Sequence, residues 1–379
     1  MRRLIQVLVA GICALHCVVA LTAPRDVVVA QVAPFTGPIS PYSKATHAGA
    51  AALFAAVNAR GGIRGAKIRF IAHDDAMDPQ RTVAAYRDIA RKESPVAFLY
   101  PVAPASVLAL MTEKVPQSEG VAVIGTIPPM YRLRSPVNPF VFHVGSGDDA
   151  EVEKIVEHIA TLGVRSVGIV YWDDPALRDA VSIVEREAAR RGVAITVRVP
   201  TPPAAAVDMD LFAGQVVNAS PNAVIALLPL SQTAQLVAGV RKRKSSMWVY
   251  GPSYNESGAL FEAAGKEYAT GVAVSQIVPN PFNPRTRLVA EYQADMRRYG
   301  PQGSRLSSLS LEGYIAAKLL VAALERLGPT PTAAQVRDSL EGLGSIDLGG
   351  LTASFGPGQH VALKFLDIGM VTSGGKLLY

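Results

Sequence analysis

Cysteine is nearly absent from this chain of 379 residues, which contains two cysteines, both close to its start. Cys13 and Cys17 lie in a charge-free stretch, Leu4 to Leu21, that follows two arginines and precedes small residues. This order is typical of a secretory signal peptide, and we expect residues 1–23 to be removed by cleavage between Ala20 and Ala23. The mature chain then has no cysteine and no disulfide, so its core must hold the fold.

A membrane anchor is the alternative interpretation of the same stretch, because 18 apolar residues reach the lower length limit of a spanning helix. Pro24 to Asp26 leads directly into a strand-like segment, however, which favours cleavage. Neither cysteine is preceded by the small residues of a lipid-attachment signal. The sequence therefore predicts a soluble protein of the periplasm.

Common catalytic motifs are also missing. The chain has no GxSxG and no GxxxxGK[ST] motif, and the glycine pair before Lys376 is typical of a hairpin between the last strands. The histidines beyond the leader show no HxxxH or HExxH spacing, so we expect no metal, no cofactor and no enzymatic activity. Asp74, Asp75 and Asp78 lack the glycine and distal glutamate of a calcium loop, and they precede Pro79, which favours turn formation and helix capping.

Charge of one sign is not concentrated in the chain, whose net charge is +6. The one basic cluster, Arg241 to Lys244, closes a helix-like stretch, where cations interact favourably with the helix dipole. We therefore expect no nucleic-acid partner.

Apolar strand-like runs, by contrast, alternate regularly with amphipathic helix-like runs. This alternation predicts parallel sheets covered by helices on both faces, and the length of the chain fits two such sheets. The predicted strands are 27–32, 68–72, 96–100, 121–124, 166–171, 194–199, 223–228, 247–250 and 271–275, followed by two strand-like runs near the end. The predicted helices are 44–60, 79–91, 106–115, 149–162, 175–191, 209–219, 232–242, 285–299, 307–326 and a short one after Pro331.

Two segments rich in glycine or proline predict domain boundaries. One is His143 to Gly147, where a strand ends before a long helix, and the other is IVPNPFNP at residues 277–284. We expect a first lobe of residues 24–144 and 279–366, and a second lobe of residues 145–278 and 367–379.

The stretch VNARGGIRGAKIRFIAHDDAMDP, residues 57–79, carries the most specific pattern in the chain. Together with the preceding QVAPFTGPISPYS, it resembles the N-terminal signature of the periplasmic substrate-binding proteins of branched-chain amino-acid ABC transporters. The resemblance continues through VFHVGSGDDAEVEK, YGPSYNESGAL and SLEGYIAAKLL, and covers essentially the whole mature chain. Met77 stands where some members of this family carry a cysteine.

The resemblance implies a type I periplasmic binding fold, in which two Rossmann-like lobes are joined by three crossover segments and a small molecule binds in the cleft between them. Such a protein makes and breaks no bond. It closes over its ligand and is presented, as a monomer, to an ABC permease in the inner membrane. A sensing module of the same fold is the alternative, and an exported hydrolase is a third reading that only scattered histidines and Asp148-Asp149 support.

The resemblance also places residues at the cleft, with several departures from the family. The loop at residues 101–106 keeps a single hydroxyl, that of Ser106. One aromatic residue of the family is replaced by Asp148, and a second aromatic position falls at Ala176 or Leu177. The acidic residue that pairs with the ammonium group of the ligand falls near Ser253 and Tyr254. Without that acid an α-amino group lacks a partner, so we expect weak binding of leucine, isoleucine and valine, and favour a small carboxylate or amide. The expected ligand-binding residues are Tyr42, Ala105, Ser106, Thr126, Pro128, Asp148, Ser253 and Tyr254.

Overall fold

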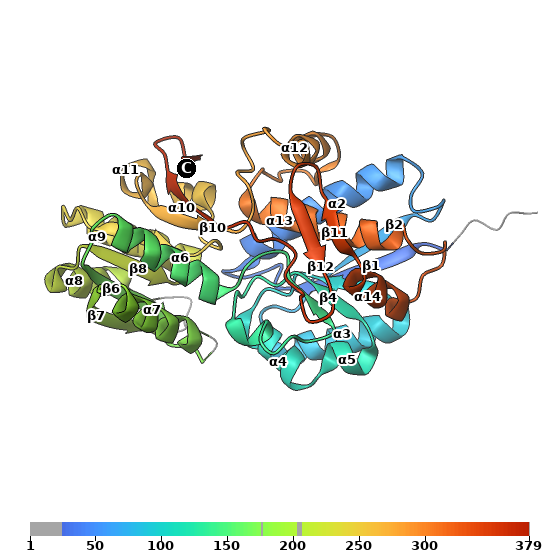
Figure 1. Ribbon diagram of the computed structural model, residues 1–379, viewed down its shortest axis with the longest axis horizontal. Helices are drawn as coiled ribbons and strands as arrows, with labels where there is room; N and C mark the ends of the chain where they lie inside the picture. The colour runs from blue at the N-terminus through green and yellow to red at the C-terminus, as the bar shows by residue number, and fades with distance from the viewer. Residues whose placement is uncertain (1–24, 176, 203–206, 379) are drawn as a thin grey trace, which may run out of the picture.

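The computed structural model describes residues 25–175, 177–202 and 207–378, which form two α/β lobes (Figure 1). The predicted signal peptide and both cysteines lie outside the described residues. In the first lobe a parallel five-stranded sheet has the order β2-β1-β3-β4-β5. Its strands are β1 (Val27–Ala33), β2 (Ile68–Asp74), β3 (Ala97–Leu99), β4 (Ala122–Ile124) and β5 (Val141–Phe142).

Helices from both halves of the sequence cover this sheet. Residues as distant as Val29, Leu320 and Phe355 share one buried apolar core, so the later segment completes the first lobe. The helices are α2 (Ser40–Ala59), α3 (Pro79–Glu93), α4 (Pro104–Thr112), α5 (Val115–Glu119), α12 (Arg287–Tyr299), α13 (Ser308–Leu324) and α14 (Ala333–Glu341), with the 3-10 turn η2 (Tyr131–Leu133) and the hairpin β11 (Gly344–Asp347) and β12 (Thr352–Phe355).

The second lobe has a seven-stranded sheet in the order β14-β13-β10-β9-β8-β6-β7. The predicted parallel arrangement is confirmed for both sheets with one exception, since β13 and β14 are antiparallel to their neighbours. The strands are β6 (Ser166–Trp172), β7 (Ala194–Thr201), β8 (Ala223–Leu227), β9 (Trp248–Gly251), β10 (Ala273–Gln276), β13 (Asp367–Val371) and β14 (Leu377–Leu378). The helices are α6 (Asp148–Thr161), α7 (Arg178–Arg190), α8 (Met209–Ala219), α9 (Leu230–Lys242), α10 (Ser257–Ala264) and α11 (Lys266–Ala269).

The joint at residues 57–79 has the predicted turn chemistry. Gly61 and Gly62 close α2 with φ of 109° and 79°, a conformation that glycine adopts without steric cost. Asp78 caps α3 by accepting hydrogen bonds from the backbone N–H groups of Gln80 and Arg81. This capping confirms the structural role predicted for the acidic turn. Within the described residues no group of histidine, cysteine, aspartate and glutamate side chains could hold a metal ion.

Helices α2 and α13 pack with their backbones in contact. A Cβ atom added to Gly49 would overlap the carbonyl oxygen of Ser310, and one added to Gly313 would overlap that of Thr46. The two helices can therefore approach this closely only because each has a glycine at the crossing. This contact fixes the N-terminal part of α2, which carries Tyr42, against the rest of the first lobe.

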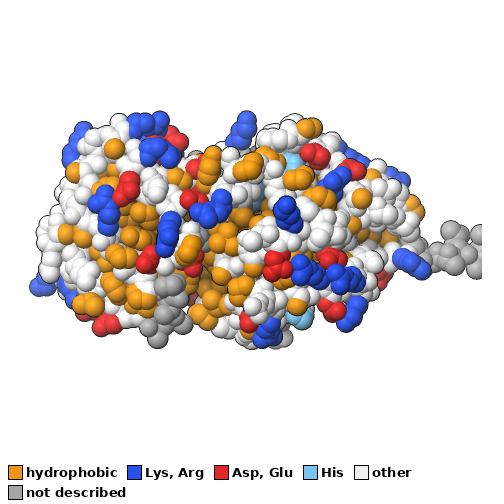
Figure 2. Space-filling view, turned by 90° about the horizontal axis from the view of Figure 1, so that it is seen from below, with side chains coloured by type: hydrophobic (Ala, Val, Ile, Leu, Met, Phe, Trp, Pro, Cys, Tyr) orange, Lys and Arg blue, Asp and Glu red, His pale blue; other side chains and the backbone are white. Residues whose placement is uncertain are grey.

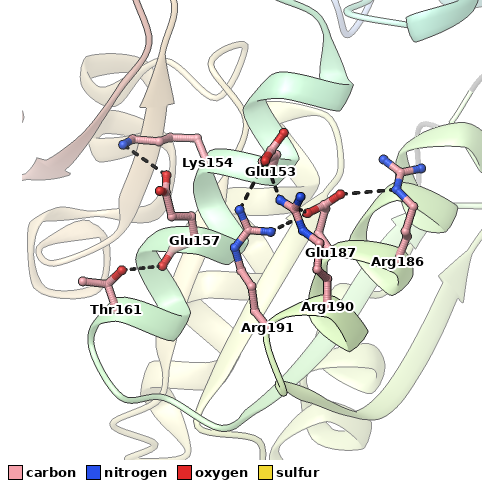
Figure 3. Close-up of polar contacts among 8 residues, drawn as sticks. All are labelled: Glu153, Lys154, Glu157, Thr161, Arg186, Glu187, Arg190 and Arg191. Carbon is pink, nitrogen blue, oxygen red and sulfur yellow. Dashed lines mark hydrogen bonds and ion pairs between the residues drawn. The ribbon is translucent and has the colours of Figure 1, made fainter.

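Charged residues join α6 to α7 on the surface of the second lobe (Figure 3). Arg190 contacts Glu153 at 2.6 Å and Glu187 at 2.8 Å, and Arg191 contacts the same two glutamates. The Glu187 side chain is only 6% exposed, so these contacts are less screened than ordinary surface pairs. The network holds the two helices that cover one face of the second sheet.

Three sequence predictions concern the ends of elements. The predicted helix at residues 106–115 is instead two helices, α4 and α5, because Lys114 adopts a left-handed conformation with φ of 52° between them. The basic cluster does end helix α9, where Arg241 donates to the carbonyl oxygens of Ser245 and Met247. The glycine pair before Lys376 does form the turn between β13 and β14. Among the described residues, no helix is both long and apolar enough to span a bilayer.

Candidate functional site

Three crossover segments connect the lobes side by side. The first and third segments pair through two backbone hydrogen bonds. The N–H of Ala362 donates to the carbonyl oxygen of His143, and the N–H of Leu363 donates to the carbonyl oxygen of Val144. Gly145, in the first, packs so closely on Ile277, in the second, that a Cβ atom would lie 2.8 Å from the isoleucine Cβ. The predicted boundaries at residues 144, 278 and 366 fall within or beside these segments and stay predictions.

A cavity of about 60 Å³ lies between the lobes, beyond the carboxyl ends of the strands. This is the position at which open α/β sheets bind ligands. Seven of the lining residues come from the first lobe and five from the second, and none of their side chains is charged. The lining residues are Ile39, Tyr42, Val102, Pro104, Ile127, Pro128, Pro129, Trp172, Leu177, Leu228, Pro229 and Tyr254. Figure 2 shows hydrophobic side chains gathered along the junction of the lobes and over the second lobe.

The polar groups of this wall are hydrogen-bond donors. The Tyr42 hydroxyl accepts a hydrogen bond from the backbone N–H of Leu230 across the cleft, at 2.9 Å, and keeps its own proton to donate. Burial raises the pKa of both Tyr42 and Tyr254, so both hydroxyls remain protonated. Trp172 Nε1 is buried and has no hydrogen-bond partner in the described part of the chain. The site therefore offers O–H and N–H groups inside an apolar wall.

The structure brings three of the eight predicted ligand-binding residues to this cavity, namely Tyr42, Pro128 and Tyr254. The Ser106 hydroxyl instead accepts a hydrogen bond from Thr82 at 2.8 Å, within the first lobe. Thr126 lies 3.2 Å from His143 Nδ1.

The other three predicted residues also lie outside the cavity wall. Ala105 is exposed on α4, Asp148 is buried at the start of α6, and Ser253 donates to Glu151 from its backbone N–H at 2.8 Å and from its hydroxyl at 3.1 Å. Their roles as ligand contacts remain predictions. Sequence reasoning did not single out Trp172, Leu228 or Pro229, and the signal for them was their place directly at or after the ends of apolar strands.

A group of buried ionisable side chains lies next to the crossover segments. Burial raises the pKa of Asp148 to about 7 and, together with the charge of Glu151, that of Glu312 to about 8. Burial also raises the pKa of Glu151, although Ser275 and Ser253 donate hydrogen bonds to its carboxylate. Arg134 is the cation of the group and donates to the carbonyl oxygens of Met130, Gly145 and Ser146. Burial thus disfavours the ionised form of all three carboxyl groups.

Two lobes, three crossovers and a cavity between strand ends define a two-lobed solute-binding protein of the type I periplasmic binding fold. The chain belongs to the periplasmic binding protein family, whose model matches residues 26–376.

Solved structures agree with this assignment. A substrate-binding periplasmic protein from Ralstonia solanacearum is 29% identical, with a TM-score of 0.88 over 93% of this chain and 99% of that one. A branched-chain amino acid ABC transporter protein from Thermus thermophilus, with bound valine, has a TM-score of 0.83 at 19% identity over 94% and 95%. Among curated proteins, the Leu/Ile/Val-binding protein of Escherichia coli K12 is 40% identical over 60 residues, a match that spans 16% of each chain.

Proposed function

We propose that the protein is an extracytoplasmic solute-binding protein of an ABC importer, and that its ligand has an apolar body and an uncharged oxygen acceptor such as an amide carbonyl. The observation that carries this proposal is the cavity between the lobes, which is lined entirely by uncharged side chains. Contacts from both lobes coexist only in the closed state, so ligand binding favours closure. The closed form is the one presented to the permease.

The charge of the wall argues against a free amino acid as ligand. A zwitterion needs charge-assisted partners at both ends in a water-excluded cleft, and an unpaired buried ion costs several kcal/mol. Glu151 is the nearest carboxylate to Ser253, but it already accepts three hydrogen bonds and does not line the cavity. An ammonium group therefore has no free partner in the wall.

The donors of the wall support an oxygen acceptor on the ligand. Trp172 presents a buried N–H without a protein partner among the described residues, and an acceptor oxygen would satisfy it. The Tyr254 hydroxyl belongs to the same wall and can donate to the same oxygen. A carboxylate would meet the same donors, but none of the residues that line the cavity is a cation that could neutralise it. A neutral carbonyl therefore fits this wall better than a carboxylate.

Three ligands with one carbon skeleton test the proposal: leucine, 4-methylpentanoate and 4-methylpentanamide. Titration calorimetry on the purified protein should show the tightest binding for the amide, weaker binding for the carboxylate and no detectable binding for leucine. Tyr254→Phe should weaken amide binding by about fivefold, since a hydrogen bond contributes roughly 1 kcal/mol. Micromolar binding of leucine, or equal affinities for all three, would refute the proposed ligand class.

A further inference from the structure

A second and much larger hollow lies beside the cavity, with a volume of about 1040 Å³. Its wall comes from both lobes: the first turns of α2, the loop before α13, the first turns of α10 and the turn between β13 and β14. We call it the lateral groove. Its large apolar side chains are Phe35, Tyr42, Leu230, Phe261, Phe282, Leu306 and Leu309.

The lateral groove is continuous with the cavity wall. Tyr42 and Pro229 line both spaces, and Leu230, whose N–H donates to the Tyr42 hydroxyl, lines the groove. One aromatic side chain and one hydrogen bond across the lobes thus form the partition. Loss of that bond when the lobes part would join the two spaces.

The cavity alone is too small to hold a long ligand, as its volume shows. The cavity measures about 60 Å³, whereas ligand pockets typically measure roughly 300 to 1,000 Å³. The lateral groove falls at the upper end of that range. A long ligand that places one end in the cavity must extend past Tyr42 into the groove.

We propose that the lateral groove holds the distal part of an elongated ligand, an alkyl or arylalkyl chain whose neutral carbonyl end lies in the cavity. This inference rests on the proposed function and names the ligand class more closely. Phe35, Phe261 and Phe282 are half-buried and provide the apolar contact for the chain. A negatively charged chain end would be disfavoured inside the groove, because Glu256 is a buried carboxyl group of its wall.

The charged residues of the groove wall other than Glu256 lie toward solvent. Lys44, Glu262, Arg305 and Lys376 are exposed, and Arg305 forms an ion pair with Glu262. His47 is neutral near pH 7, because burial lowers its pKa to about 4. Apart from Glu256, the wall is thus uncharged inside and charged at its rim.

Two ligands and three variants test the groove. The short probe is 4-methylpentanamide and the long probe is 6-phenylhexanamide. Ala259, on α10, lines the groove, and Ala259→Phe would fill it without reaching the cavity wall. Ala263, one turn later on the same helix, is exposed and does not line the groove, so Ala263→Phe is the matched control. Ala45→Phe fills the groove from α2 on the opposite lobe and replaces Ala259→Phe should that variant fail to fold.

Calorimetry of the wild-type protein should show binding of the long probe at least about tenfold tighter than of the short one, because burial of each methylene group is favourable. Ala259→Phe should remove this advantage and leave the short probe within about twofold, and Ala263→Phe should change neither value. The inference would be overturned if the wild-type protein bound the two probes equally well, or if Ala259→Phe and Ala45→Phe both bound the long probe as tightly as the wild type. Either result would leave the proposed function intact. Absence of binding of both probes would instead refute the proposed function.

Discussion

Glu312 is a carboxyl group in the interior of the protein, 3% exposed on α13. Its partner is the Tyr100 hydroxyl, which donates to Oε2 at 3.4 Å, a long and weak hydrogen bond. Burial and the neighbouring Glu151 raise the pKa of Glu312 from 4.5 to about 8. A carboxyl group with a raised pKa in the folded state penalises folding wherever the unfolded chain is ionised.

The free energy of unfolding should therefore fall as the pH rises from about 4.5 to about 8, the two pKa values between which only the unfolded chain loses this proton. Glu312→Gln removes the titration and keeps an oxygen to accept from Tyr100. Urea unfolding at pH 5 and pH 9 should show a smaller loss of stability in the variant, by on the order of 2 to 4 kcal/mol. Glu325→Gln, at the exposed end of α13, should behave like the wild type. An unchanged pH dependence in Glu312→Gln would contradict the assignment.

Single residues of the site were only partly predictable from the sequence. Tyr42 and Tyr254 could be placed near the cleft because they belong to segments that resemble the family and correspond to positions at its cleft. The partners of Ser106 and Ser253 could not be foreseen, because Thr82 and Glu151 lie 24 and 102 positions away along the chain. Trp172 carries no polar motif, and its unsatisfied N–H becomes visible only in three dimensions.

At the level of elements, the crossing of α2 and α13 depends on two glycines. Gly313→Ala places a methyl group on the backbone of Thr46, where no flexible side chain can move aside. We expect a loss of about 3 kcal/mol or more in the free energy of unfolding, at the upper end of the range for overpacked cores. Gly328→Ala, a position with open space around it, should change stability by less than about 0.5 kcal/mol. Thermal and urea unfolding of the two variants make the comparison, and equal stabilities would show that the helices separate at little cost.

Most elements could be predicted because strand and helix periodicities alternate clearly and glycine or proline marks their ends. The split between α4 and α5 was missed, because a left-handed lysine such as Lys114 has no sequence signature. Strand β5 has only two residues, which is too short to show the alternation of apolar and polar residues typical of a strand. Strand β13 pairs with β10 in the antiparallel direction, since the chain returns to the second lobe only at residue 367. Such pairings depend on contacts between distant parts of the chain.

For the whole molecule, the balance between open and closed lobes depends on a few contacts across the cleft. Tyr42 accepts from the N–H of Leu230, Arg132 pairs with Asp179 at 2.7 Å, and Arg305 pairs with Glu262. The two ion pairs are solvent-exposed, and such pairs contribute roughly 0.2 to 1 kcal/mol each. The hydrogen bond between Tyr42 and Leu230 is partly buried, so we expect it to contribute more to closure.

Tyr42→Phe leaves the Leu230 N–H without its partner and should shift the ligand-free protein toward the open form. Small-angle scattering should report a larger radius of gyration for Tyr42→Phe than for Asp179→Asn, which removes only an exposed pair. Added salt should change the difference in radius of gyration between Asp179→Asn and the wild type, because it screens exposed ion pairs. The difference between Tyr42→Phe and the wild type should stay the same, because contacts away from solvent are little screened. Identical scattering curves for Tyr42→Phe and the wild type would show that this hydrogen bond does not control the lobes.

The three crossovers also determine when during synthesis each lobe can be completed. The core of the first lobe joins Val29 to Leu363, and the sheet of the second lobe needs β13, which begins at residue 367. The last segments of both lobes are therefore synthesised near the end of translation, although all five strands of the first sheet have been synthesised once residue 142 is reached. A chain truncated before residue 363 has an incomplete first core and an uncovered edge on β10. Truncated products should consequently be protease-sensitive throughout, with no stable single lobe among them.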